Sequence, residues 1–204
     1  MEEQTMEVQT VEEQTIEEQT TGCLVCGAPL EYLQSQIEME CTYCHKTFMS
    51  NARCVNGHFI CDSCHEQMGL RVIEDICRHT DSKDPVAIMK KIILSPYIYM
   101  HGPEHHVLVG SALLAAYKNA GGELDLDAAL EEMRNRGAQV PGGICGLWGT
   151  CGAAVSTGIF VSLITGASPL SGKEWGLCIC RRIGIPTSIR YKRTLGDRLL
   201  LDCR

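Results

Sequence analysis

Apolar residues recur at helical spacing through the second half of the chain, from residue 66 onward. The boundaries between these stretches are clear. Asp84 before Pro85 is typical of a helix start, and Gly121 and Gly137 are typical of helix ends. Helices are therefore predicted over residues 61–78, 86–94, 103–120, 125–136 and 153–167. The third has a wide apolar face formed by Val107, Ala112, Leu113, Leu114 and Ala116.

The stretch before residue 66 favours short strands instead of helices. Residues 30–39 are predicted to form a pair of strands, and strand-like runs follow at 46–50 and 58–60 with a turn around Asn51 between them. The first twenty residues differ again, since they repeat the pentapeptide pattern MEEQT-MEVQT-VEEQT-IEEQT. An apolar residue every five positions fits no regular helix, so we expect a disordered acidic tail there.

Eight potential metal ligands lie in the strand-rich stretch, spaced as C-x2-C-x14-C-x2-C-x9-C-x3-H-x2-C-x2-C. They form four close pairs: Cys23/Cys26, Cys41/Cys44, Cys54/His58 and Cys61/Cys64. A C-x2-C turn directs both sulfurs at one ion, and two tetrahedral zinc sites need eight such ligands. The spacing therefore predicts two zinc ions with closed coordination, each contributing to folding and leaving no open position for a substrate.

Two pairings of these ligands are compatible with the spacing. In the cross-braced pairing, the first and third pairs share one ion and the second and fourth share the other. In the sequential pairing, the first two pairs form a ribbon and the last two a compact second site. His65 follows Cys64 and is either a spare ligand or a surface residue of the helix that begins there.

The predicted fold class is α-rich and α+β overall. It combines a small N-terminal two-zinc module of short β-hairpins, treble-clef-like or zinc-ribbon-like, with an all-α helical domain. The expected divisions are an acidic tail at 1–21, the zinc module at 22–66, the helical domain at 67–175, and a basic tail at 176–204 that is truncated or non-native. That last segment carries seven basic residues against two acidic ones.

A second group of candidate residues lies in the uncharged segment PGGICGLWGTCGAAVSTGIFVSLITGA, residues 141–167. Cys145 falls in a glycine-rich loop and Cys151 at the predicted start of a helix, where backbone N–H groups favour thiolate. Glycines around them would let a cofactor or substrate approach the backbone: Gly142, Gly143, Gly146, Gly149 and Gly152. The alternative is that both cysteines are small buried apolar residues.

His105 and His106 open the predicted helix over 103–120, so one of them could serve as a base or metal ligand beside the cysteines. Neighbours on a helix point in different directions, and both cannot face one site. The sequence does not choose between them.

Charge and composition restrict the expected cellular location and the expected class of partner. The first twenty residues hold seven Glu and no Lys or Arg, which excludes a secretory signal, and the cysteines then indicate a reducing cytoplasmic location. A net charge of −7 and 5% aromatic residues disfavour nucleic acid as a partner. The many glycines in 141–167 disfavour a membrane span. A protein partner or homo-oligomer is expected.

Two segments carry a resemblance, MHGPEHHVLVGSALLAAYKNAGG and VPGGICGLWGTCGAAVSTGIFVSLITGASPLS. Together with the CxxC elements, they resemble an uncharacterised domain-of-unknown-function family of anaerobic archaea and bacteria, some members of which are called methyltransferases. The segment from Cys151 is also distantly similar to redox-active proteins with a C-GCAxxG-C-C pattern. In those families the later cysteines belong to the site, which implies roles for Cys178 and Cys180. No nucleotide-binding strand and glycine loop occurs here, so methyl transfer would require another domain.

Two functions follow from these patterns. The first is a zinc-binding protein with a redox-active or cofactor-handling site in anaerobic metabolism, formed by Cys145 and Cys151 with His105 or His106, and with an iron–sulfur or other metal centre as a further cofactor. The second is a non-enzymatic adaptor whose zinc module binds a protein or nucleic acid. Whether the chain is an enzyme stays open.

Overall fold

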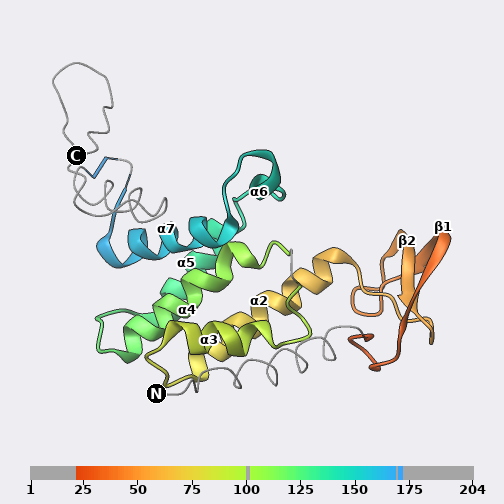
Figure 1. Cartoon of the computed structure of the whole chain (residues 1–204), viewed down its shortest axis with the longest axis horizontal. Coiled ribbons are helices and arrows are strands. Elements are labelled where there is room, and N and C mark those ends of the chain that lie inside the picture. The colour runs from red at the N-terminus through yellow and green to blue at the C-terminus, as the bar shows by residue number, and fades with distance from the viewer. Residues whose placement is uncertain (1–21, 100–101, 169, 172–204) are drawn as a thin grey trace, which may run out of the picture. The chain divides into compact units, whose positions relative to one another are not determined.

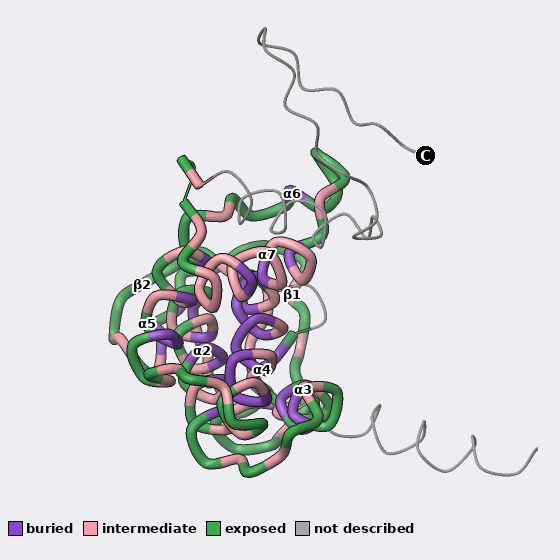
Figure 2. Tube along the Cα trace, turned by 90° about the vertical axis from the view of Figure 1, so that its left-hand side faces the viewer, coloured by how far each residue is buried: buried purple, intermediate pink, exposed green. Residues whose placement is uncertain are grey.

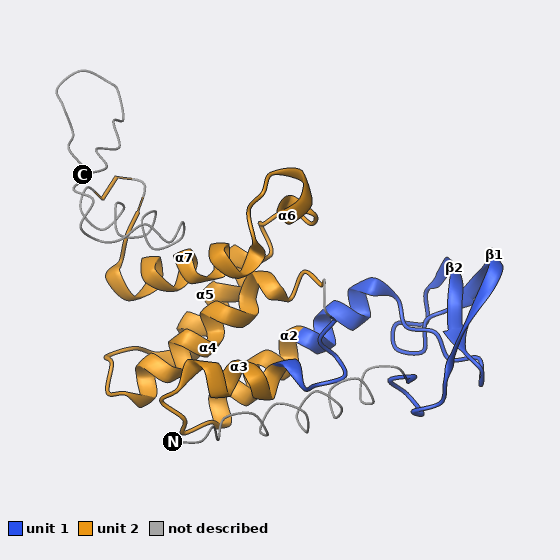
Figure 3. Cartoon of the chain, viewed as in Figure 1, with its two compact units in different colours: residues 1–69, 93–100 blue, residues 70–92, 101–204 orange. Residues whose placement is uncertain are grey.

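The computed structural model describes residues 22–99, 102–168 and 170–171 (Figure 1). In chain order the described elements are β1 (Leu30–Glu40), β2 (Thr47–Cys54), α2 (Asp62–His79), α3 (Pro85–Ile93), α4 (His105–Asn119), α5 (Leu126–Gly137), α6 (Ile144–Leu147) and α7 (Gly152–Thr165). They divide into two compact units, residues 1–69 with 93–100 and residues 70–92 with 101–204 (Figure 3). The predicted fold class, a small β-hairpin module followed by helices, is confirmed.

The first unit contains one two-stranded antiparallel sheet, in which β1 pairs with β2. The predicted strand pair within residues 30–39 is wrong, because these residues lie in a single strand. The predicted turn around Asn51 is also wrong, since this residue lies inside β2, and residues 58–60 belong to no described strand. The chain reverses instead at residues 41–46, between the two strands.

Three tight turns in the first unit share one backbone feature, a residue in the left-handed region. Gly27 (φ 72°), His45 (φ 56°) and Gly57 (φ 84°) each follow or lie between metal-ligand candidates. Their N–H groups donate to the carbonyl oxygens of Cys23 (2.7 Å), Cys41 (2.9 Å) and Cys54 (2.7 Å), respectively. Glycine is the expected residue at the first and third turns, whereas His45 adopts the same conformation with a side chain. Its ring pairs with Glu40 at 2.8 Å.

Helix boundaries follow local capping chemistry. The Asp84 carboxylate accepts the N–H of Val86 at 2.8 Å at the start of α3, and the Asp125 carboxylate accepts the N–H of Ala128 at 3.2 Å at the start of α5. The observed ends lie close to the predicted ones. The four-residue helix α6 was not predicted from the sequence. It lies in a glycine-rich stretch with no helical apolar spacing.

Helix α4 is the centre of the second unit and packs against both α7 and α5. Buried residues run along most of α4, as the purple segments of Figure 2 show. Of the apolar face predicted for this helix, only Leu113 is partly exposed. Helices α4 and α7 contact each other at Gly110, whose N–H donates to Ser156 Oγ on α7 at 2.7 Å. A Cβ at this glycine would lie 2.3 Å from Met133 Cε and 2.6 Å from the Ser156 carbonyl oxygen.

Helix α7 holds much of the uncharged segment that raised the question of a membrane span. It has 14 residues and a length of about 21 Å, against about 30 Å of bilayer hydrocarbon. None of the helices in the described ranges combines the length and the apolar composition that a transmembrane helix requires.

Replacing Gly110 by alanine tests this packing. We expect Gly110→Ala to lower the free energy of unfolding by about 1–3 kcal/mol, because the new methyl group must displace both Met133 and the α7 backbone. Gly146→Ala is the matched control, since nothing lies within 4 Å of a Cβ there and alanine favours helix. Thermal denaturation followed by circular dichroism measures both variants, and equal melting temperatures would contradict the packing.

Candidate metal centres and thiol site

The first cluster of potential metal ligands consists of Cys23, Cys26, Cys54 and His58. Their ligand atoms all lie within 4.8 Å of one another. The Cys26 and Cys54 sulfurs are 3.5 Å apart, and the Cys23 sulfur is 3.8 Å from His58 Nδ1. Ligands placed tetrahedrally about 2.3 Å from one zinc ion would be about 3.8 Å apart, so these separations suit such an ion.

The second cluster consists of Cys41, Cys44, Cys61 and Cys64, whose sulfurs also lie within 4.8 Å of one another. Cys41 and Cys44 lie in the turn between β1 and β2. Cys61 and Cys64 lie at the start of α2, where the helix N-terminus favours thiolate. The Cys44 and Cys61 sulfurs are 3.8 Å apart, again the separation expected for two ligands of one tetrahedral ion.

The two clusters correspond to the cross-braced pairing. The first takes ligand pairs one and three along the chain, and the second takes pairs two and four. The sheet links them, because β2 runs from the turn that holds Cys41 and Cys44 of the second cluster to Cys54 of the first. β2 therefore fixes the distance between the two clusters.

Hydrogen bonds from backbone N–H groups to sulfur prepare both clusters for thiolate. Val25 N–H donates to Cys23 Sγ at 3.4 Å, Asn56 N–H to Cys54 Sγ at 3.3 Å, and Cys61 N–H to Cys41 Sγ at 3.3 Å. A bond from the Ala28 backbone, helped by the Asn56 side chain, lowers the pKa of Cys26 to about 6. Such bonds stabilise the charged form that a metal ligand needs.

Burial and crowding raise the pKa of three cluster thiols, those of Cys54, Cys61 and Cys64. Burial raises the pKa of Cys64 to about 12, and the neighbouring thiols of Cys61, Cys44 and Cys41 add to the effect. Burial also raises the pKa of Cys54 and of Cys61. Thiolates so close together repel one another, and a bound dication removes that repulsion. Both donor sets, one of three cysteines with a histidine and one of four cysteines, suit tetrahedral zinc.

Two other histidines of this region lie outside the clusters. His45 is exposed and pairs with Glu40. His65 is neither a member of a ligand group nor a surface residue, so both expectations for it are wrong. It is buried, and its ring stacks on Tyr99 with centroids 3.6 Å apart and an interplanar angle of 3°.

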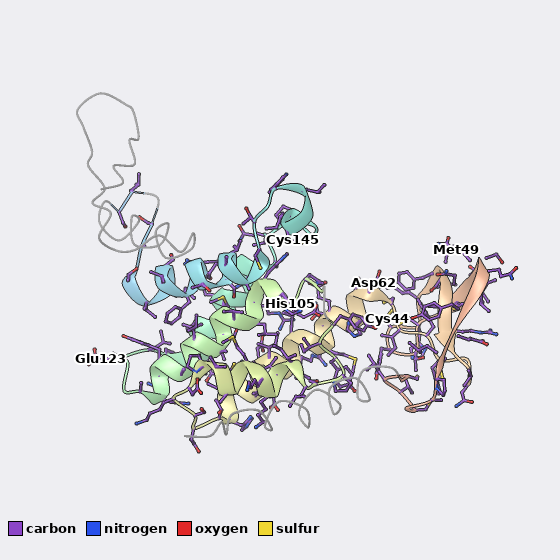
Figure 4. All side chains as sticks on the ribbon, in the orientation of Figure 1. Cys44, Met49, Asp62, His105, Glu123 and Cys145 are labelled. Carbon is purple, nitrogen blue, oxygen red and sulfur yellow. The ribbon has the colours of Figure 1, made fainter. Side chains whose placement is uncertain are left out.

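The predicted thiol site lies in the second unit, on the loop that carries α6. Cys145 lies on α6 (Figure 4). Cys151 occupies the N-cap position of α7 without a side-chain capping bond, and both cysteines are exposed. The interpretation of these cysteines as small buried residues is therefore wrong. Leu147 and Trp148 between them are exposed as well. A Cβ at Gly142, Gly146 or Gly149 would meet nothing within 4 Å, so the backbone of this loop is open to an incoming molecule among the described residues.

Only one of the two candidate histidines is placed at the start of α7. A Cβ at Gly152 would lie 2.3 Å from His106 Cδ2 and 3.0 Å from His106 Nε2, so this imidazole packs directly against the residue after Cys151. His106 is buried, whereas His105 is partly exposed. The fold therefore favours His106. A side chain at Gly152 would overlap the His106 ring, so this position requires glycine for packing. Gly142, Gly146 and Gly149 differ, because a side chain there would meet nothing within 4 Å.

Sequence reasoning missed two features of the second unit. Glu104 immediately precedes α4, and its side chain is buried against Gly102. Cys77 on α2 is 1% exposed, and burial raises the pKa of its thiol to about 12. Its apolar neighbours at helical spacing, Ile73 and Leu70, were the available signal for a core cysteine. Cys178 and Cys180 lie outside the described residues.

The sequence was compared with known families, proteins and structures. The model of a family of unknown function, DUF5714, matches residues 73–182, and the chain belongs to this family. No curated protein and no solved structure matches the chain significantly. The matched region covers the α4 to α7 helices, the thiol segment and Cys178 and Cys180, and it begins beyond all eight potential metal ligands.

Double substitutions distinguish the two pairings of metal ligands. In Cys23→Ser/Cys54→Ser both changes fall in one cluster, so we expect one of two bound zinc ions to remain. In Cys23→Ser/Cys41→Ser each cluster loses a ligand, so both ions should be lost or weakly held. Metal analysis after gel filtration gives the stoichiometry. The reverse pattern would mean that the sequential pairing is correct.

Thiol alkylation tests the contrast between Cys77 and the loop cysteines. In the native zinc-loaded protein at pH 8, we expect iodoacetamide to modify Cys145 and Cys151 and to spare Cys77 until the chain is unfolded. The raised pKa of Cys77 also destabilises the fold as pH climbs above 9.0, its ordinary pKa, because only the unfolded chain then ionises this thiol. Peptide mass mapping measures the labelling, and equal labelling of all three would contradict the burial.

Proposed function

We propose that this member of DUF5714 is a zinc-stabilised protein whose helical unit presents reactive thiols, Cys145 and Cys151, for redox or cofactor-handling chemistry in the cytoplasm of an anaerobe. The observation that carries the zinc part is the gathering of eight ligands into two four-membered clusters. The thiol part is supported by the exposure of both cysteines on one open loop.

The zinc ions have a structural role in this proposal. Every cluster already offers four protein ligands, so a tetrahedral ion has no open position for a substrate. Zinc binding contributes roughly 10–16 kcal/mol in small modules of this type, which exceeds what a short hairpin can supply by itself. The clusters resemble those of a treble-clef finger, with a knuckle, a hairpin and a helix start in sequence.

The thiol chemistry belongs to the segment between α6 and α7. Cys151 lies at the positive end of α7, and the buried imidazole of His106 packs against the next residue. We assign His106 the role of accepting the thiol proton of Cys151. Oxidation would join Cys145 and Cys151 in one disulfide, releasing two protons and passing two electrons to a disulfide acceptor. Methyl-group or iron–sulfur chemistry would need further ligands, for which Cys178 and Cys180 are the candidates.

A redox titration of the zinc-loaded protein tests this proposal. After anaerobic purification, the chain is equilibrated with reduced and oxidised glutathione at varied ratios, and alkylated peptides are analysed by mass spectrometry. We expect a reversible Cys145–Cys151 disulfide, absent in Cys145→Ser and Cys151→Ser. His106→Gln should slow alkylation of Cys151 by about tenfold to hundredfold, and His105→Gln is the matched control. Metal analysis and the visible spectrum are recorded in parallel.

Several outcomes would refute the thiol proposal. If Cys145 and Cys151 form no disulfide at any glutathione ratio, the loop has no redox role. If metal analysis finds two zinc ions alone and the spectrum shows no visible absorption, the protein holds no further metal centre. If His105→Gln and His106→Gln had equal effects, the role of His106 would be wrong. Neither result would affect the zinc clusters.

A second candidate function is a non-enzymatic adaptor. The observation in its favour is that large apolar side chains of the zinc module are exposed, among them Tyr32, Tyr43 and Val55. The module also precedes the region that the family model matches. A surface of this kind is typical of a protein-binding site.

A further inference from the structure

The pairing register of β1 and β2 determines which residues share a face of the sheet. Residues directly opposite each other in an antiparallel pair point to the same side. Leu30 opposes Cys54, Tyr32 opposes Ala52, Ile37 opposes Ser50, and Met39 opposes Phe48. All four partners on β2 are at even positions, so these eight residues lie on one face. Its large side chains are apolar.

A bulge in β1 brings these apolar residues onto one face. From Tyr32 to Ile37 the chain advances five positions, while β2 advances two between their partners Ala52 and Ser50. Without the irregularity, the odd step would turn Ile37 and Met39 to the side opposite Leu30 and Tyr32. The bulge therefore places the apolar residues of both parts of β1 on one face, although in the sequence they change from even to odd positions.

Each end pair of this face has one buried and one exposed residue, and the large apolar side chains between the ends are exposed. Met39 is 7% exposed and Cys54 is fully buried, but Leu30 is 39%, Tyr32 75%, Ile37 37% and Phe48 36% exposed. We call these four exposed residues the apolar sheet face. Exposed apolar patches of this kind on a small module mark a binding surface.

The opposite face of β1 is acidic. Glu31, Glu38 and Glu40 all point there, since their partners on β2 are Arg53, Met49 and Thr47. Arg53 pairs with Glu31, and His45 pairs with Glu40. Residues 22–69 carry five carboxylates against two basic side chains, a net charge of −3. Bound zinc leaves further negative charge, because three or four thiolates exceed the charge of one dication.

The edge of β1 thus presents apolar side chains on one face and carboxylates on the other. No further strand pairs with β1 among the described residues, where the sheet has two strands. A peptide laid along this edge would alternate its side chains between the two faces, as strand-addition complexes do. Apolar residues would then meet the apolar sheet face, and basic residues would meet the glutamates. Nucleic acid and a second copy of this acidic module match the charge less well.

We propose that the outer edge of β1 binds an extended peptide segment with alternating apolar and basic residues. This partner chemistry rests on the adaptor function and not on the thiol chemistry of the helical unit. The apolar sheet face supplies affinity, and Glu38 and Glu40 supply selection for positive charge.

Two synthetic peptides of equal composition test the proposal. One is an octapeptide in which lysine and valine alternate, and the other has the same residues as a lysine block followed by a valine block. Binding of each fluorescein-labelled peptide to the zinc-loaded full chain is measured by fluorescence anisotropy. We expect the alternating peptide to bind at least about tenfold more tightly than the block peptide.

Variants locate the binding surface. Tyr32→Ser and Glu38→Lys/Glu40→Lys should each weaken binding of the alternating peptide by about tenfold or more. Met49→Ser is the matched control, because Met49 is 60% exposed on the other face and its change should leave affinity unaltered. Cys145→Ser/Cys151→Ser should also bind normally, which separates this result from the thiol proposal. Metal content confirms that each variant is folded.

Three results would overturn the proposal. Equal affinity for the two peptides would mean general attraction to positive charge. Loss of binding in Met49→Ser equal to that in Tyr32→Ser would mean that the apolar sheet face is not the contact. Absence of binding, with a dimer that dissociates in Tyr32→Ser, would identify a second copy of the chain as the occupant.

Discussion

The gathering of eight ligand atoms into two clusters that could each hold a metal ion is the constraint on which the first unit depends. Among its described residues, Met39 and Ile98 are the only large apolar side chains that are buried, apart from four cysteines. A core of this size cannot offset the conformational entropy of some fifty ordered residues. The sulfur clusters replace it. Backbone N–H bonds to sulfur and the start of α2 favour thiolate, burial opposes it, and a metal ion removes the opposition.

The second unit is stabilised by a different means, the close approach of helices through small residues. Gly110 allows α4 to contact α7, and Ser156 fills the contact with a hydrogen bond. The same pair of helices places His106 against Gly152, one residue after Cys151. The interface between α4 and α7 therefore contains both the close contact at Gly110 and the candidate histidine His106. The exposed loop beyond it has no comparable contacts among the described residues, which leaves Cys145 and Cys151 accessible.

Much of this organisation could be predicted from local patterns in the sequence. The capping signal at Asp84 located one helix start, and regular ligand spacing located the eight ligands of both clusters. The strand pairing could not be predicted, since the segment with Cys41 and Cys44 acts as the hairpin turn and a bulge alters the alternation in β1. The choice of His106 over His105 needed the position of α7, which is a tertiary contact without a local signal. Burial of His65 on Tyr99 is of the same kind.

The crossed arrangement of ligands also imposes an order on events during synthesis. The first cluster lacks its fourth ligand until His58 has been made, and by then Cys41 and Cys44 of the second cluster already lie within the enclosed loop. Neither cluster can be completed while the other is still wholly unmade. The last ligand, Cys64, follows His58 by only six residues, so both ligand sets become complete within one short interval of elongation.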